Sequence, residues 1–127
     1  MSWTKQILIT VSLVIFSINP SFGVWKENAK AIDISGGEDH TLVLGENGNT
    51  FGCGDNSSYQ LGIGDSTNEQ FILVTVHSGD MNTASGWLEN IADIDAGWTH
   101  SLALDANNNV WAWGNNGNGQ LGNGETC

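Results

Sequence analysis

The chain has 127 residues, and its 14 acidic residues against 3 Lys and Arg give a formal net charge of −11. Phosphate binding needs clustered Lys or Arg, so this balance argues against a nucleic-acid partner. The six Trp and 39% hydrophobic content exclude a disordered acidic tail, and the length allows at most one ordinary domain. The acidic balance instead indicates solubility, a basic partner or cation-rich surroundings.

The first 23 residues have the three-part pattern of a secretory signal peptide. Lys5 precedes the apolar run Ile7–Ile18, Asn19-Pro20 breaks it, and small residues stand at positions 21 and 23. The run is too short for a membrane span, which needs about 20 residues. We expect cleavage after Gly23, with a retained anchor as the alternative. The mature chain would be secreted or periplasmic, free of the membrane, and would begin with a linker at 24–30.

Two cysteines, Cys53 and Cys127, are the only ones in the chain. Export permits a disulfide between them, but the sequence does not fix their separation. A free, buried Cys53 is the alternative.

An internal repeat organises the rest of the chain. Shifted by 60 positions, residues 31–67 align with 91–127 without a gap, and 14 of the 37 positions are identical. This order of Gly, His, Leu and Gln-Leu-Gly is not expected of low-complexity sequence. The repeats are predicted at 31–77 and 91–127, the second incomplete, with 78–90 as a loop anchored by Trp87 and Leu88.

Each copy is predicted to form short strands separated by turns. Apolar and polar residues alternate, both leucines of the second strand share a face, and no segment has a helical period. Asn47-Gly48 is predicted to make a tight hairpin in which both central residues have positive φ. The leucine of Gln-Leu-Gly is expected to plug into the core. The predicted strands are 31–35, 41–44, 50–53, 71–77, 92–95, 101–104 and 110–113.

These repeats resemble the regulator of chromosome condensation repeat family. The second copy, AGWTHSLALDANNNVWAWGNNGNGQLGNG, follows the family pattern almost throughout. The first copy departs from it, because Cys53 replaces a Trp, Tyr59 replaces a Gly, and Glu69-Gln70 stand where a Pro is usual. The spacing of 60 is also longer than the usual repeat of the family. The resemblance implies an all-β fold of antiparallel β-propeller blades, about two of an expected seven.

Two blades do not close a propeller, which needs about four to eight. The expectation is therefore a fragment of a longer secreted propeller of bacterial type, completed by further repeats. Self-assembly of several copies into a ring is the alternative.

The recurring histidines, His40 and His100, are interpreted as structural residues that hydrogen-bond neighbouring strands. The segment 105–109 faintly resembles the start of a calcium loop, but Val110 and Asn116 occupy the Gly and Glu positions, so a hairpin turn is favoured. Carboxylates of the Gly-rich tails (Asp55, Asp65 and Glu125) are expected to be solvated. Neither a cofactor nor a metal is expected, and no catalytic motif indicates an enzyme.

Binding is the expected function. The variable pair between Gly and His is Glu38-Asp39 in one copy and Trp98-Thr99 in the other, and these four residues are the candidate partner-binding loop. Packing of Trp98 between the blades is the alternative. The favoured function is a secreted, non-enzymatic scaffold that binds a protein or a glycan, since the family includes a secreted bacterial inhibitor of β-lactamases. The alternative is the family's guanine-nucleotide exchange on a small GTPase.

Overall fold

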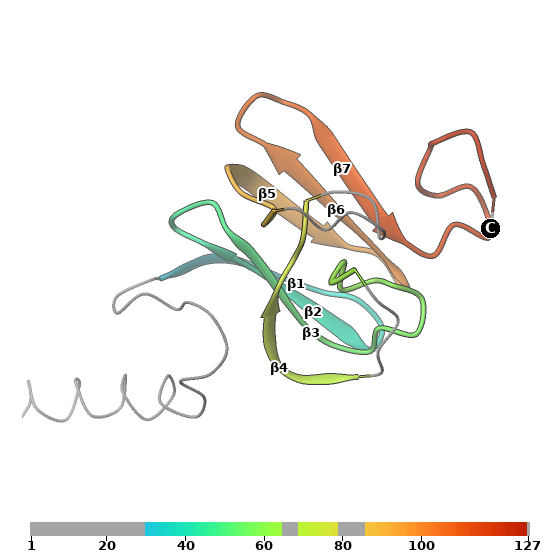
Figure 1. Cartoon of the computed structure of the whole chain (residues 1–127), viewed down its shortest axis with the longest axis horizontal. Helices are drawn as coiled ribbons and strands as arrows, with labels where there is room; N and C mark the ends of the chain where they lie inside the picture. Colours follow the sequence, from blue (N-terminus) through green and yellow to red (C-terminus); the bar gives the residue numbers. More distant parts are fainter. Residues whose placement is uncertain (1–29, 65–68, 79–85, 127) are drawn as a thin grey trace, which may run out of the picture.

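The computed structural model describes residues 30–64, 69–78 and 86–126. Within them the secondary structure consists of strands, and no helix there is long and apolar enough to cross a membrane. The expected all-β class and the seven strands are confirmed, with ends that differ by one or two residues (Figure 1). The strands are β1 (Ala31–Gly36), β2 (His40–Gly45), β3 (Thr50–Gly54), β4 (Gln70–Thr75), β5 (Ile91–Ala96), β6 (His100–Asp105) and β7 (Val110–Gly114).

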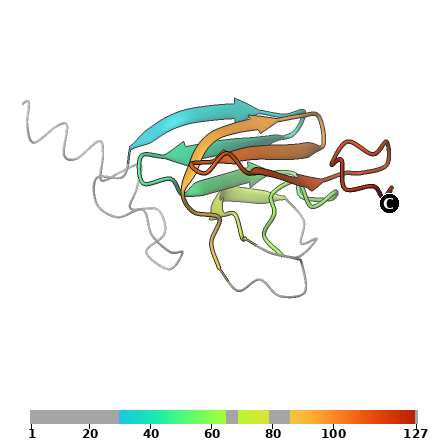
Figure 2. The ribbon, with the colours of Figure 1, turned by 90° about the horizontal axis from the view of Figure 1, so that it is seen from above.

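Two antiparallel sheets correspond to the two repeats. The first, blade 1, has the order β1-β2-β3-β4, and the second, blade 2, has the order β5-β6-β7. Equivalent strands pair in the same register, with the same bulge after Ala31 and after Ile91. Figures 1 and 2 show the two sheets next to each other, with β5 beside β1 and β2.

The hairpin turns differ from the prediction. Only Gly48 and Asn108 have positive φ, at 77° and 66°, whereas both central residues were expected to. Gly48 N–H donates to Gly45 O, and Asn108 N–H donates to Asp105 O. Each loop is therefore a β-turn followed by one left-handed residue, a longer hairpin that needs positive φ only once. This explains why Asn can replace Gly in the second copy.

The apolar core lies between the two blades. It consists of residues from both sheets and from the segment that joins them: Leu42, Leu44, Val76, Leu88, Ile91, Ile94 and Ala103. The leucine of Gln-Leu-Gly is buried in the first copy, where Leu61 is fully buried as expected, but Leu121 of the second copy is only half-buried. Of the expected loop anchors, Leu88 is buried but Trp87 is exposed and stacks edge-on against His77. Burial of these side chains is the main force that holds the blades together.

The polar tail of each repeat is a hydrogen-bonded loop built by its Asn and Gln. Asn56 Oδ1 accepts from Leu61 N–H at 3.0 Å, and Gln60 Oε1 accepts from Ser58 N–H at 2.8 Å. Asn116 and Gln120 make the equivalent bonds to Leu121 and Asn118. These side chains thus accept hydrogen bonds from backbone N–H groups that are not paired in a sheet. This accounts for the recurrence of Asn and Gln-Leu-Gly.

Candidate protein-binding site

The recurring histidines were predicted to hydrogen-bond neighbouring strands, and His40 makes such a bond between the two blades. His40 Nε2 lies 2.9 Å from Ser101 Oγ, and Ser101 Oγ donates to Gln60 O at 2.8 Å. Because the single hydroxyl proton goes to Gln60, the oxygen of Ser101 accepts from His40, which places the imidazole proton on Nε2. Burial lowers the pKa of His40, which favours this neutral form. We call this chain of two hydrogen bonds the His40 relay.

Glycine three residues before each histidine lets the imidazole approach the backbone closely. A Cβ at Gly37 would collide with the His40 ring, and a Cβ at Gly97 would collide with the His100 ring. The Gly-x-x-His spacing therefore fixes the course of the turns β1–β2 and β5–β6. Glu38 N–H then donates to Trp98 O at 3.1 Å, so the two turns lie side by side at one end of the blades.

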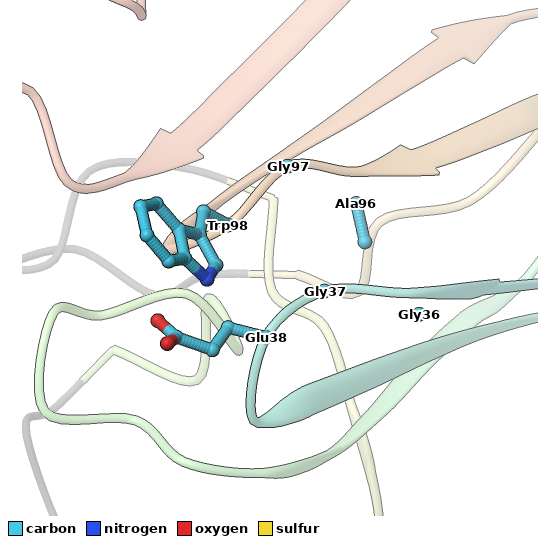
Figure 3. A pocket seen from close by; sticks show the side chains of 6 residues that line it. All are labelled: Gly36, Gly37, Glu38, Ala96, Gly97 and Trp98. Carbon is cyan, nitrogen blue, oxygen red and sulfur yellow. The ribbon is translucent and has the colours of Figure 1, made fainter.

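A shallow hollow, open to solvent, lies between these two turns. It is lined by Gly36, Gly37, Glu38, Ala96, Gly97 and Trp98, and we call it the rim hollow. Figure 3 shows the Trp98 indole and the Glu38 side chain on the same side of the hollow, with the indole nitrogen turned toward Glu38. Trp98 is 71% exposed, so it is not packed between the blades.

The four candidate residues lie in these same two turns, but only two of them line the hollow. Glu38 and Trp98 line it, whereas Asp39 is exposed beside it and Thr99 is half-buried. The backbone carbonyls of Asp39 and Thr99 accept from Asp55 N–H and Asn115 N–H. The backbone of the hollow is thus held by both sheets, while its two large side chains stay free to meet a partner.

Sequence reasoning missed the residues that shape the floor of the hollow. Gly36, Gly37, Ala96 and Gly97 leave its surface open because they carry at most a methyl group. The Gly-x-x-His spacing was the available signal. It could not show that the two turns meet, because this depends on the packing of the blades.

Carboxylates of the turns are occupied by hydrogen bonds within the chain. Asp105 accepts from Asn109 Nδ2 and N–H and from Asn107 N–H, each at 2.8–2.9 Å, and these bonds lower its pKa. Bonds from Ser57, and more weakly from Gln60, likewise lower the pKa of Asp55. Both carboxylates hold turns, in line with the hairpin interpretation of 105–109.

Groups with metal or redox chemistry are not gathered in the described ranges. Within 30–64, 69–78 and 86–126, no three His, Cys, Asp or Glu side chains form a metal-binding group. Cys53 carries a free, half-buried thiol, and burial raises its pKa. A thiol with a raised pKa is a poor nucleophile at neutral pH. Asp65 and Cys127 lie outside the described residues.

Fold and site together define a pair of β-propeller blades that present turns at a rim. Models described as the regulator of chromosome condensation (RCC1) repeat match residues 31–60, 91–120 and 47–104, which together span 31–120. The chain therefore belongs to the RCC1 repeat family.

Relatives of known name are much longer than this chain. The chain is 37% identical over 99 residues to the ultraviolet-B receptor UVR8 of Arabidopsis thaliana, covering 78% of this chain and 21% of that protein. It is 35% identical over 86 residues to the human X-linked retinitis pigmentosa GTPase regulator, covering 68% of this chain and 8% of that protein. The chain thus spans about a fifth or less of the length of these two relatives.

Solved structures confirm the fold. Human WBSCR16 superposes with a TM-score of 0.66 at 22% identity, over 82% of this chain and 24% of that one. Prp20p of Saccharomyces cerevisiae superposes with a TM-score of 0.64 at 18% identity, over the same shares. At such identities the likeness extends to the fold alone.

Proposed function

We propose that the chain is part of a secreted, non-enzymatic propeller scaffold that binds a protein at the rim hollow. The observation that carries this is Trp98, a large aromatic side chain held 71% exposed on a turn whose backbone is fixed by hydrogen bonds to both blades. Such aromatic residues on rigid turns are the usual anchors of protein interfaces. Export is proposed from the signal-peptide pattern of residues 1–23.

The charge beside Trp98 indicates the kind of surface that it would meet. Glu38 lines the hollow, Asp39 is exposed next to it, and the chain as a whole carries a net charge of −11. A partner with basic residues around an apolar pocket would complement this surface. Its association would slow as salt screens the attraction.

Capture by the immobilised chain tests this function. The full chain, Trp98→Ala and Phe71→Ala are exposed to proteins of the organism's culture medium and cell surface. Phe71 is the matched control, because it is an aromatic residue 90% exposed on β4 and it does not line the rim hollow. We expect proteins retained by the wild type and by Phe71→Ala but lost with Trp98→Ala, which should weaken the dissociation constant by ~30-fold or more.

Equal retention of the same proteins by all three would refute a role for Trp98. Retention that is abolished by glycosidase treatment of the ligand would assign a glycan instead of a protein surface.

The GTPase regulator among the relatives favours a second candidate, exchange-type regulation of a small GTPase. Prp20p is likewise described with its binding to Gsp1p and histones. A nucleotide-release assay with a panel of small GTPases separates the two. Faster release in the presence of the chain would favour this candidate over the scaffold.

A further inference from the structure

Several asparagines of the chain are followed directly by glycine, a pair that favours spontaneous chemistry of the side-chain amide. They are Asn47, Asn116, Asn118 and Asn123. In such a pair the backbone nitrogen of the glycine can attack the Cγ atom of the asparagine, because glycine has no Cβ to hinder the approach. The attack needs a side chain open to water and a glycine nitrogen that is not held by an acceptor. The fold therefore decides which of these asparagines reacts.

Three of the pairs are protected by the fold. Gly48 N–H donates to Gly45 O and Gly119 N–H donates to Asn116 O, each at 2.9 Å, so the nitrogens of two pairs are held in β-turns. Asn116 itself is 2% exposed, so the third pair is closed to water. Attack on Cγ would have to break a turn or open a buried loop.

The pair Asn123-Gly124 differs in both respects. Both residues are exposed, and Gly124 N–H has no acceptor among the residues that the structure describes. Asn123 Oδ1 accepts from Glu125 N–H at 3.1 Å, which closes a ring that contains the Gly124 nitrogen. This Asx turn folds the Asn123 amide back over the nitrogen that would attack it.

A second donor contacts the same oxygen of Asn123. Asn116 Nδ2 donates to Asn123 Oδ1 at 3.0 Å, and Asn116 is fixed because its own Oδ1 accepts from Leu121 N–H. Two donors on one carbonyl oxygen stabilise the negative charge that develops there when a nucleophile adds to the carbon. By contrast, Asn47 Oδ1 accepts from Asn49 N–H at a longer 3.3 Å and has no second donor among the described residues.

The access of water to this site does not depend on what lies beside blade 2. Ile63 and Gly64 occupy the equivalent positions in blade 1, and both are partly exposed. Blade 2 lies against that tail, since Trp113 Nε1 donates to Gln60 O at 2.8 Å. The equivalent glycines of the two tails also have the same φ of 84°. The position thus stays open to solvent even where a neighbouring blade is packed against the loop.

We propose that Asn123 is a site of spontaneous modification, at which the folded chain promotes its own deamidation. The Gly124 nitrogen forms a bond to Asn123 Cγ, the Cγ–Nδ2 bond breaks, and ammonia leaves with the proton of the Gly124 nitrogen. Water then opens the resulting succinimide at either carbonyl, which leaves aspartate or isoaspartate at position 123. Water is the only co-reactant, and no electrons are transferred. Each event adds one negative charge to the tail of blade 2.

Tandem mass spectrometry of the full chain tests the proposal, because it resolves the conversion of each asparagine separately. The chain is incubated at neutral pH with and without urea. In urea the turns are lost, so the local sequence alone sets the four rates. We expect Asn123 to deamidate at least as fast in the folded chain as in urea, whereas the other three asparagines should react much more slowly when the chain is folded.

Asn116→Asp tests the second donor, since its carboxylate still accepts from Leu121 N–H but donates nothing to Asn123 Oδ1. Asn56→Asp is the matched control, because Asn56 makes the equivalent bond to Leu61 N–H in blade 1. We expect Asn116→Asp to slow the reaction at Asn123 by roughly 10-fold or more. The control should leave that rate unchanged.

Two results would overturn the proposal. One is a folded chain in which Asn47 or Asn118 deamidates as fast as Asn123. The other is an Asn123 rate that Asn116→Asp and Asn56→Asp change to the same extent while both variants stay folded. The rate at Asn47 reports whether a variant is folded, because it rises to its value in urea when the turn is lost. If a variant unfolds, the ratio of the folded and urea rates at Asn123 in the wild type decides.

Discussion

At the scale of single residues, two equivalent glycines have different surroundings. A Cβ at Gly37 would meet the His40 ring and also the backbone carbonyl of Gly97, 2.6 Å away. For a Cβ at Gly97, the three nearest atoms all belong to the His100 ring. His40 is held by the relay and is buried, whereas His100 is half-buried and can turn aside.

Substitution of these two glycines should therefore have unequal effects. Gly37→Ala is expected to lower the free energy of unfolding by about 1–3 kcal/mol, because neither the ring nor the carbonyl can move away. Gly97→Ala is expected to cost less than about 1 kcal/mol. Urea denaturation of the two variants measures both values. Equal losses would show that the His40 ring is no more confined than the His100 ring.

Tyr59 is a second position at which one residue departs from its repeat. It has a φ of 61°, where the second copy has Gly119 at 74°. The left-handed conformation is unfavourable in free energy for tyrosine but not for glycine. The loop therefore keeps the same backbone conformation even though tyrosine disfavours it. Its Asn and Gln hydrogen bonds explain why, since they fix the loop on both sides of Tyr59.

At the scale of elements, Ser101 joins β6 of blade 2 to both β2 and the tail loop of blade 1. Ser101→Ala would leave His40 Nε2 buried without an acceptor and remove one of the two donors to Gln60 O. We expect a loss of about 1–3 kcal/mol in the free energy of unfolding. A double-mutant cycle with His40→Ala measures the coupling. If the two losses simply add, the residues do not interact.

Many of these strands and contacts could be predicted from the sequence, because the repeat contains each residue pattern twice. The strands, the buried Leu61 and the structural role of His40 all follow from positions shared by both copies. The hairpin type was wrong, because Asn47-Gly48 fits more than one loop length and strand register decides among them. The exposure of Trp87 was missed because its edge-on contact with His77 depends on the fold of the joining segment.

The candidate site was predictable only in part, for a similar reason. Variation between the copies at Glu38 and Trp98 marked the two turns that line the hollow. The sequence left open whether Trp98 is packed or exposed, since this depends on how β5 docks against β1 and β2. Contacts between repeats depend on how the blades pack. They are therefore harder to predict from the sequence than contacts within a single repeat.

At the scale of the whole molecule, we expect cleavage during export to determine the first residue of the mature chain. The signal-peptide pattern places cleavage after Gly23, so the exported protein should begin at Val24. It would then carry 2 Lys against 14 acidic residues, a net charge of 2 − 14 = −12. Amino-terminal sequencing of the protein recovered from the medium or periplasm checks this. A chain that retains Met1 and sediments with membranes would instead support the anchored alternative.

The two blades pack into one unit through the His40 relay, and the NMR signals of the His40 imidazole report on this packing. Burial lowers the pKa of His40 below its ordinary value of 6.5. As the pH falls below 6.5, the unfolded chain takes up this proton before the folded chain does, so the His40 contribution to stability is complete above that pH and is lost below it.

Nitrogen-15 spectra across this pH range should show His40 neutral, with its proton on Nε2, well below pH 6.5. In Ser101→Ala the hydrogen-bonded Nε2 proton signal should disappear. A ring that titrates at or above 6.5, or one that carries its proton on Nδ1, would contradict the His40 relay and with it the proposed packing of the blades.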